Sequence, residues 1–412
     1  YTLGVMLYEW MAGRLPFEGD DPLAFIGQHL HAPVVPPREH NPEIPPALDA
    51  LIVQLMSKRP EDRPASAEEV RQVLEALARG PAAEEVPLAR PHEPAFLTGA
   101  EERRVERPAF VARQRELARL DRFLEEALEG QGRVVFVTGG PGRGKTALLD
   151  AFARRAMEQH AGLLVASGTC NAYSGVGDPY LPFRDLLGML TGDVEARWAA
   201  GALSRDHALR LWEALPQAIQ VLLDHGPHVV NTLVPGRALR SRAAIALPAT
   251  SPLRRRLDER FEPQRDGSES LEQSYLFQQV TNVLRTLAGA HALLLVLDDL
   301  QWADTASISL LFHLGRRVGD ARILIACAYR PEEVALGREG ARSGERERHP
   351  LEKILSEFKR RYGPVWVDLA EAEGHGFVDA FLDTEPNRLG QDFRRALFAH
   401  TAGHPLFTIE LL

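Results

Sequence analysis

The sequence has few cysteines, no long apolar run and no group of residues with the spacing of a metal site. Cys170 and Cys327 are its only cysteines and lie far apart, so they suit small buried side chains in a reducing compartment better than a disulfide. Apolar runs such as Ala292 to Leu297 are far shorter than a membrane span, and no signal peptide opens the chain. We therefore expect a cytoplasmic protein without a membrane partner.

An excess of basic residues is also missing. The 412 residues carry a net charge of −9 and are 45% hydrophobic, which favours globular domains and argues against general affinity for nucleic acid. Arginines cluster between 237 and 265, but Asp258, Glu259 and Glu262 lie among them, so we interpret this stretch as a solvated helix face. Because the chain begins at Tyr1 and ends at Leu412 within a helical pattern, we expect it to be a piece of a larger protein.

Residues 1–80 have the patterns of a small helical domain. We expect helices at 2–12, from the N-cap Asp21 with Pro22 to about Leu30, after Pro46, and after the capping pair Ser66 and Glu69. The first is apolar nearly all round, which indicates a buried helix, and Gly13 ends it. The prolines, glutamates and arginines that follow cannot bury enough apolar surface to order a backbone, so we expect residues 81–107 to be a linker.

From residue 108 onward, helices and strands alternate. A helical pattern at 110–128 is followed by buried strand patterns at 133–138, 163–169, 292–298, 323–328 and 365–369, with helices between them. This alternation predicts an α/β fold with a parallel sheet, which we assign to residues 108–375. The stretch from about 188 to 274 is a helix-biased insertion, and the sequence indicates no function for it.

One loop of this α/β domain has the phosphate-binding pattern G-x-x-x-x-G-K-[ST]. It runs from Gly139 to Thr146, between the strand at 133–138 and a helix, which is the context that separates such a loop from an ordinary glycine-rich turn. The glycines let the backbone bend around a polyphosphate, and the helix N-terminus adds positive potential. Lys145 would reach the β- and γ-phosphates, and Thr146 would hold Mg²⁺. The predicted nucleotide contacts are Gly139, Gly140, Pro141, Gly142, Arg143, Gly144, Lys145, Thr146 and Ala147.

Two carboxylates, Asp298 and Asp299, stand at the end of the apolar strand at 292–298. Central parallel strands bring such acids to the carboxyl edge of a sheet, where phosphates would lie. Asp298 can hold Mg²⁺ through a water, and Asp299 can polarise the water that attacks ATP. Acids after a strand can instead cap a helix; the phosphate loop favours the catalytic interpretation of this pair, whereas we interpret Asp304 as a helix N-cap.

Arginines supply the remaining candidates. Arg330 follows the strand at 323–328, where it could sense the γ-phosphate or pair with the carboxylate of Glu332, and the sequence leaves both alternatives open. Arg316 and Arg317 are weaker candidates for an arginine finger that acts on a second molecule. We interpret these two residues as part of a solvated helix face.

Taken together, these motifs resemble the STAND branch of the AAA+ ATPases over about residues 108–412. The resemblance rests on Phe110 to Leu117, the phosphate loop, Asp298 to Asp304, the strand that ends at Arg330, and Gly403-His404-Pro405. It implies that Val111 and Arg113 contact the nucleotide and that Pro405 lies near the base, in a helical lid that starts at about 376. It also implies five strands, with one strand between the phosphate-loop strand and the strand that ends in Asp298. Ala112 stands where that family usually has glycine.

Residues 1–80 resemble the end of the C-terminal lobe of a bacterial serine/threonine protein kinase. The likeness is carried by Tyr1 to Glu9, by Gly13 to Phe17, and by Lys58 to Pro64. Arg63 matches the family arginine that pairs with a glutamate at the end of the activation segment, and that glutamate is absent here. The glycine-rich loop, the phosphate-binding lysine and the catalytic aspartates are absent as well, so this piece cannot transfer phosphate by itself.

The leading hypothesis is a kinase-linked signalling ATPase that binds ATP or ADP with Mg²⁺, with Lys145, Asp299 and Arg330 in catalytic roles. We expect other signalling proteins as partners through domains outside this chain, and a nucleotide-dependent oligomer is an open possibility. One alternative is a scaffold that holds nucleotide without turnover, because the pair Asp298-Asp299 ends in a short acid that places water poorly. A weaker alternative is a DNA-handling loader, against which the acidic net charge counts.

Overall fold

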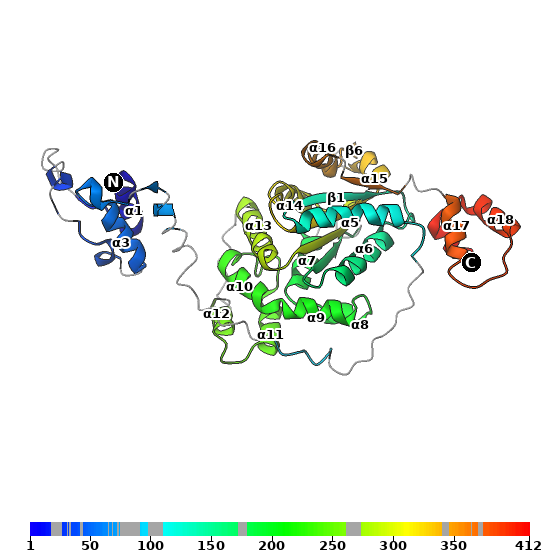
Figure 1. Ribbon diagram of the computed structural model, residues 1–412, viewed down its shortest axis with the longest axis horizontal. Helices are drawn as coiled ribbons and strands as arrows, with labels where there is room; N and C mark the ends of the chain where they lie inside the picture. Colours follow the sequence, from blue (N-terminus) through cyan, green and yellow to red (C-terminus); the bar gives the residue numbers. More distant parts are fainter. Residues whose placement is uncertain are drawn as a thin grey trace. The chain divides into compact units, whose positions relative to one another are not determined.

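In the computed structural model, the chain forms two compact units, residues 1–88 and 89–412. The structure describes residues 1–17, 27–30, 32, 34–41, 44–64, 66–67, 69–71, 74, 91–97, 110–171, 179–260, 273–339, 346–363, 365–369 and 374–412. Figure 1 shows the elements of both units along the sequence. In the part of the chain that is described, no helix is both long and apolar enough to cross a membrane.

The first unit is helical in its described parts. Its elements are α1 (Thr2–Ala12), the 3₁₀ turns η1 (Pro37–Glu39) and η2 (Pro60–Asp62), and α3 (Pro46–Leu55). Gly13 ends α1 with φ 70°, as glycine does at a helix C-terminus, and the N–H of Glu69 donates to Oγ of Ser66 at 3.2 Å. The predicted N-cap at Asp21 and Pro22 lies outside the described residues.

Helix α1 buries only one of its faces within this unit. Tyr8 packs with Ile52 and Met56 in a small core. By contrast, Leu3, Met6 and Trp10 are 44%, 42% and 65% exposed. Because these three side chains lie about one helical turn apart, they form an apolar stripe, so the nearly all-round apolar pattern of α1 is matched within this unit by burial on one face only.

This stripe predicts that residues 1–80 self-associate when they are produced alone, because contiguous exposed apolar surface drives association. Light scattering at increasing concentration measures the effect. A matched variant with Leu3→Lys and Trp10→Lys removes the stripe while keeping the helix, and it should be monomeric. A monomeric wild-type fragment that melts cooperatively would refute the prediction.

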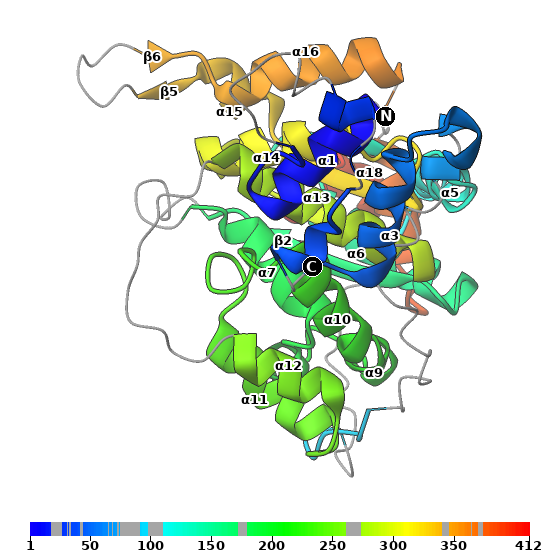
Figure 2. The ribbon, with the colours of Figure 1, turned by 90° about the vertical axis from the view of Figure 1, so that its left-hand side faces the viewer.

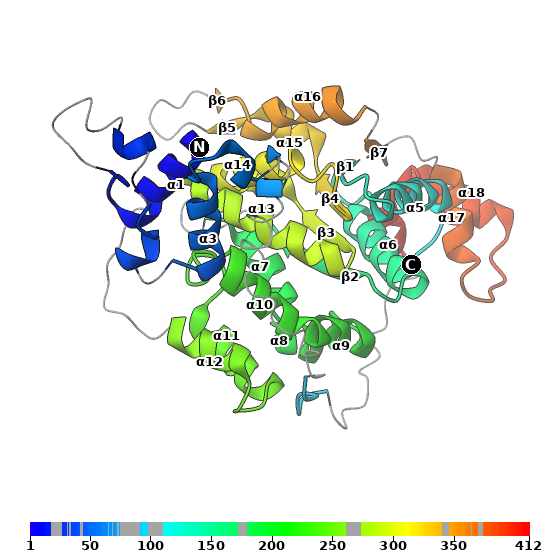
Figure 3. The same cartoon turned by 60° about the vertical axis from the view of Figure 1, so that its left-hand side comes forward.

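The second unit is built on a five-stranded parallel sheet. Its strands are β1 (Arg133–Thr138), β2 (Leu164–Thr169), β3 (Leu293–Asp298), β4 (Ile323–Tyr329) and β7 (Trp366–Asp368), in the order β2-β3-β4-β1-β7 (Figure 3). The parallel α/β sheet predicted from the sequence is confirmed. Strand β4 separates β3 from β1, as the resemblance implied, and a short antiparallel ribbon joins β5 (Arg338–Glu339) to β6 (Arg346–Glu347).

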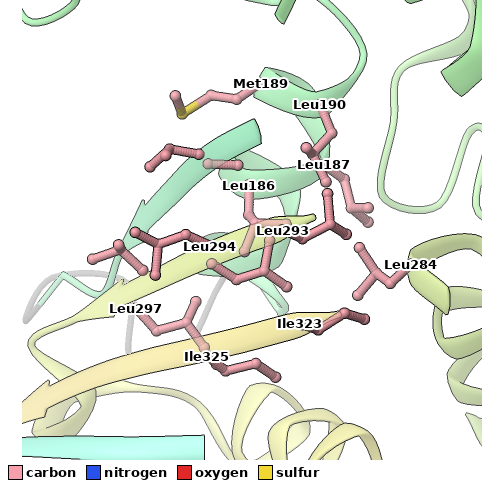
Figure 4. Packing of buried hydrophobic residues seen from close by; sticks show 14 of the residues in the cluster. Leu186, Leu187, Met189, Leu190, Leu284, Leu293, Leu294, Leu297, Ile323 and Ile325 are labelled. Carbon is pink, nitrogen blue, oxygen red and sulfur yellow. The ribbon is translucent and has the colours of Figure 1, made fainter. Parts of the chain in front are cut away.

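Helices cover the sheet. Helices α5 (Gln114–Leu128) and α6 (Lys145–Gln159) pack together beside β1. A second group is formed around α14 (Thr305–Gly315), which contacts α7 (Leu181–Leu190), α13 (Gln273–Ala290) and α16 (Pro350–Tyr362). Figure 4 shows leucines of α7, β3 and α13 interlocking with Ile323 and Ile325 of β4. In the strand order β2-β3-β4-β1-β7, the connection from β1 to β2 runs in the opposite direction to the connections that follow, so the right-handed crossover rule assigns the two groups of helices to opposite faces of the sheet.

The predicted insertion is helical. It contains α8 (Glu195–Ala199), α9 (Arg205–Glu213), α10 (Leu215–His225), α11 (Gly236–Ala246) and α12 (Pro252–Arg260), and Figure 2 shows the last four of them grouped together. Arg242 of α11 corrects the interpretation of the arginine cluster as a solvated face. Its side chain is largely buried, and its Nε donates to the carbonyl of Thr191 at 2.8 Å, so it holds α11 against the end of α7.

Two further regions complete the second unit. After β4 come α15 (Pro331–Leu336) and, beyond β7, the helices α17 (Gly374–Leu382), α18 (Gln391–Thr401) and α19 (Pro405–Glu410). Residues 91–97 lie within the segment predicted to be a linker, yet they pack on the insertion, and Leu97 is fully buried. The composition misled here because side chains elsewhere in the chain satisfy the backbone of this segment.

Candidate functional site

The phosphate-loop residues form a tight turn between β1 and α6. Gly142 and Gly144 have φ 66° and 83°, left-handed values that glycine adopts without strain. The side chain of Lys145, 6% exposed, folds across the loop and its Nζ donates to the carbonyls of Gly139 at 2.8 Å and Gly140 at 2.9 Å. Burial, reinforced by the positive charge of Arg330, lowers the pKa of Lys145. A buried cation thus lies at the centre of the loop, where its hydrogen bonds to carbonyl oxygens could be replaced by hydrogen bonds to phosphate oxygens.

Thr146 and Asp298 meet although 152 residues separate them. The Thr146 hydroxyl donates to Oδ2 of Asp298 at 2.6 Å, and Oδ1 of Asp298 accepts the N–H of Asp299 at 2.8 Å. Burial raises the pKa of Asp298, and the nearby charge of Asp299 adds to the rise, while the hydrogen bonds from Thr146 and from the Asp299 N–H and the charge of Lys145 oppose it. Among the described residues, no group of three His, Cys, Asp or Glu side chains could hold a metal. Mg²⁺ needs no such group, since one or two protein oxygens, substrate phosphates and waters suffice.

Asp299 and Arg330 face each other at the carboxyl edge. Asp299 has a left-handed backbone with φ 54°, and its Oδ1 accepts a hydrogen bond from Nε2 of Gln301 at 2.7 Å. Nη2 of Arg330 lies 3.8 Å from the same oxygen. Aspartate tolerates left-handed backbone better than most residues, and the hydrogen bond from Gln301 helps to hold its side chain in place here.

Arg330 pairs with a nearby carboxylate, as one of the two alternatives expected, but its partner is Glu333 and not Glu332. Nη1 of Arg330 lies 2.6 Å from Oε1 of Glu333, and the guanidinium stacks 4.9 Å from the ring centre of Trp302. Its buried Nε has no acceptor within the described ranges. Arg330 therefore retains a donor that an anion could take.

Sequence reasoning missed Gln301, which connects the parts of this edge. This buried side chain donates to Asp299, and its Oε1 accepts the backbone N–H of Arg330 at 3.1 Å. Its own carbonyl accepts from Nε2 of His349 at 2.9 Å. Asp304, as predicted, caps α14 by accepting the N–H of Ser307. The position of Gln301, two residues after Asp299, was the only sequence signal for its role.

The C-terminal helices touch the phosphate loop. Nε2 of His404 lies 2.9 Å from the carbonyl of Pro141, and the N–H of Leu406 donates to the carbonyl of Gly142 at 3.3 Å. A Cβ added at Gly142 would come within 2.6 Å of the His404 ring. Glycine at this position thus permits both the loop's conformation and the close approach of α19.

Arg113 holds the segment before α5 against the loop. Its buried guanidinium donates to the carbonyl of Arg143 at 3.3 Å and to that of Leu369 at 3.5 Å, and it pairs with Glu116 at 2.9 Å. These contacts join the start of α5, the end of β7 and the phosphate loop. In this structure the side chain organises the loop backbone, a role that the resemblance did not suggest.

Ala112 provides a sharp test of this segment, because its φ of 57° is a left-handed value. Ala112→Gly should raise the free energy of unfolding by about 0.5–1 kcal/mol, since relief of left-handed strain exceeds the entropy that glycine adds to the unfolded chain. The same substitution at the exposed helical position Ala118 should lower it by about 1 kcal/mol. Denaturant unfolding of both variants measures whether the two changes in the free energy of unfolding have opposite signs. If both variants are less stable than the wild type, the backbone of Ala112 is not strained.

Part of this site lines one cavity of about 500 Å³. One part of its lining is charged and comes from the phosphate loop, Asp299 and Arg330, and the other is apolar. The apolar part comprises Phe110, Val111, Phe377, Pro405, Leu406 and Ile409. Of the predicted residues, Val111, Arg113, Gly142 to Ala147, Asp299, Arg330 and Pro405 line the cavity, whereas Gly139, Gly140, Pro141 and Asp298 do not. Asp150 and Arg154 of α6 also line it and were not predicted.

Comparison with known proteins identifies the second unit. The family model described as AAA ATPase domain matches residues 109–326, more than half of the chain, and the chain belongs to this family. The match contains the phosphate loop, the two acids and most of β4. It accords with the P-loop NTPase fold that the sheet order defines and supports ATP binding and ATPase activity at this site.

Similarity to protein kinases is confined to a short part of the chain. Serine/threonine-protein kinase pkn3 of Myxococcus xanthus is 44% identical over 79 residues, and PksC of Streptomyces coelicolor is 42% identical over 71. PknB of Mycolicibacterium smegmatis is 37% identical over 101 residues. These matches cover 17–24% of this chain, and the chain spans only 13–15% of the length of these relatives. The chain thus joins a kinase-related piece to an AAA ATPase domain.

Proposed function

We propose that this chain is the ATPase part of a serine/threonine kinase fusion, a STAND-type switch that binds ATP with Mg²⁺ and changes conformation with nucleotide state. The observation that carries the proposal is that α19 hydrogen-bonds directly to the phosphate loop through His404 and Leu406. Whatever occupies the loop therefore acts on the C-terminal helices. Differential contact of this kind is what a ligand needs in order to shift a conformational equilibrium.

The chemistry assigned to the cavity follows from its two parts. The apolar part would take the base, with Val111 and Pro405 beside it, and Lys145 and the loop N–H groups would hold the phosphates. Thr146 and Asp298 supply the oxygens that would hold Mg²⁺. The charge of the ion would compensate both the phosphates and the buried carboxylate of Asp298. Asp299 would orient the attacking water, and Nε of Arg330, which has no acceptor among the residues that the structure describes, would meet the γ-phosphate.

A nucleotide-holding scaffold is the second candidate, and the contacts of Asp299 favour it. Oδ1 of this carboxylate already accepts from Gln301 and faces Arg330, so in this arrangement one of its two oxygens is engaged by the protein and not by water. Cytoplasmic location and signalling partners reached through other domains belong to both candidates.

Phosphate release separates the two functions. With ATP and Mg²⁺ in excess, the switch predicts steady release well above that of the Lys145→Ala variant, although slowly. The scaffold predicts ATP or ADP binding with release equal to that variant. Absence of nucleotide binding by the wild type would reject both.

A further inference from the structure

Residues 91–97, here called the docked segment, lie along the helical insertion and are held there at several points. Leu97 is fully buried and belongs to the same apolar core as the sheet, and Pro94 is buried as well. The segment ends in a turn, in which the N–H of Leu97 donates to the carbonyl of Pro94 at 2.9 Å. It is therefore anchored by an apolar side chain and has a defined conformation.

Three insertion helices contact the backbone of the docked segment. Nε1 of Trp212 in α9 donates to the carbonyl of His92 at 2.9 Å, and Nε1 of Trp198 in α8 donates to the carbonyl of Phe96 at 3.1 Å. The N–H of His92 donates to the carbonyl of Ala246, the last residue of α11, at 3.1 Å. Recognition of main-chain groups by fixed donors is the means by which proteins bind extended peptides.

Side-chain contacts fix the alignment of the docked segment along the insertion. Nη2 of Arg205 lies 2.5 Å from Oε1 of Glu93, and its Nε lies 3.4 Å from the carbonyl of Leu97. The Phe96 ring meets the Trp212 ring edge-on, with 6.0 Å between their centroids. Arg205 and Glu93 are partly exposed, so their pair selects one alignment of the segment more than it strengthens binding.

The docked segment covers polar and apolar groups of the insertion. With the segment in place, Trp212 is 1% exposed and its indole N–H has the carbonyl of His92 as acceptor. Displacement of the segment would expose this aromatic side chain to water, and truncation of Leu97 would leave a cavity in the core. These side chains have no evident task in the nucleotide cavity, and none of them lines it.

We propose that the face formed by α8, α9 and α11 is a peptide-docking surface whose occupant is the chain's own segment 91–97. This surface recognises an acidic residue, a proline, an aromatic residue and a leucine, in the order found in Glu93-Pro94-Ala95-Phe96-Leu97. The surface anchors the chain at this point, before the chain reaches the nucleotide cavity at Phe110. This inference is independent of ATP binding.

A labelled peptide of residues 89–99 tests the proposal on the full chain. Leu97→Asp in the chain should displace the docked segment and free the surface. The wild-type peptide should then bind this variant about tenfold or more tightly than it binds the wild-type chain, in which the surface is occupied. A peptide carrying the same Leu97→Asp change should bind neither. Equal binding to both chains, or no binding to the variant while its circular dichroism is native, would overturn the proposal.

A second pair of variants covers the case in which Leu97→Asp disturbs folding. Glu93→Arg places like charges opposite each other at a partly exposed position, so the fold should survive while amide exchange at His92 and Leu97 accelerates about tenfold. Adding Arg205→Glu restores opposite charges and should restore slow exchange. Unchanged exchange in the single variant, or no recovery in the double variant, would show that the insertion does not recognise this segment.

Discussion

Lys145→Ala is expected to weaken ATP binding by about 100-fold or more, because it removes the buried cation at the centre of the phosphate loop. In the wild type, Nζ is held by the carbonyls of Gly139 and Gly140, so its position is set before any phosphate arrives. Alanine leaves those carbonyls facing the phosphates without the charge that compensates them. Calorimetric titration with ATP and Mg²⁺ measures the loss.

The control for this variant is Lys359→Ala, which removes the same charge from an exposed position in the last turn of α16. Its ATP affinity should match that of the wild type. If Lys145→Ala binds ATP as tightly as wild type, the cavity is not the nucleotide site, and the assignments of Thr146 and Asp298 lose their basis.

Asp299→Asn is expected to lower phosphate release by about 100-fold or more while ATP affinity changes little. The amide keeps the size of the side chain and can keep the contact with Gln301, but it cannot accept a proton from water. The change also removes a negative charge opposite Arg330. Steady-state phosphate release and ATP titration on the same preparation separate the two effects.

Asp258→Asn, on an exposed face of α12, is the matched control and should leave phosphate release unchanged. If the Asp299→Asn variant releases phosphate at the wild-type rate, Asp299 is not the general base. A wild type without turnover would instead favour the scaffold.

The sheet and the phosphate loop could be predicted because their signals are local. Each strand is a short run of buried apolar residues, and Gly139 to Thr146 must join a strand to a helix to bind phosphate. The structure confirms the parallel sheet, with strand bounds close to those expected. Asp298 could be placed at the carboxyl edge for the same reason, since its strand ends there.

Contacts between distant segments could not be predicted. Gln301, Glu333 and His404 acquire their partners only when β3, β4 and α19 meet at one edge, and no spacing in the sequence encodes those meetings. Arg113 was expected at the nucleotide from the resemblance alone, whereas its geometry places it on loop carbonyls as well.

Composition misled at the docked segment and at Arg242. A proline-rich stretch was expected to lack order, but the indoles of Trp198 and Trp212 satisfy its carbonyls. Arg242 belongs to a charged cluster and was expected to be exposed to solvent, but its side chain is largely buried and donates to the carbonyl of Thr191. In both cases the compensating group lies far away in the sequence.

The central claim, that nucleotide in the loop controls the C-terminal helices, is tested most directly by hydrogen exchange over residues 374–412 with and without Mg²⁺ and ATP. We predict that nucleotide changes the exchange of α19 by about tenfold in the wild type, because His404 and Leu406 contact the loop. The Lys145→Ala variant should show no change at the same ATP concentration. Exchange over residues 374–412 that is identical with and without bound ATP in the wild type would contradict the account.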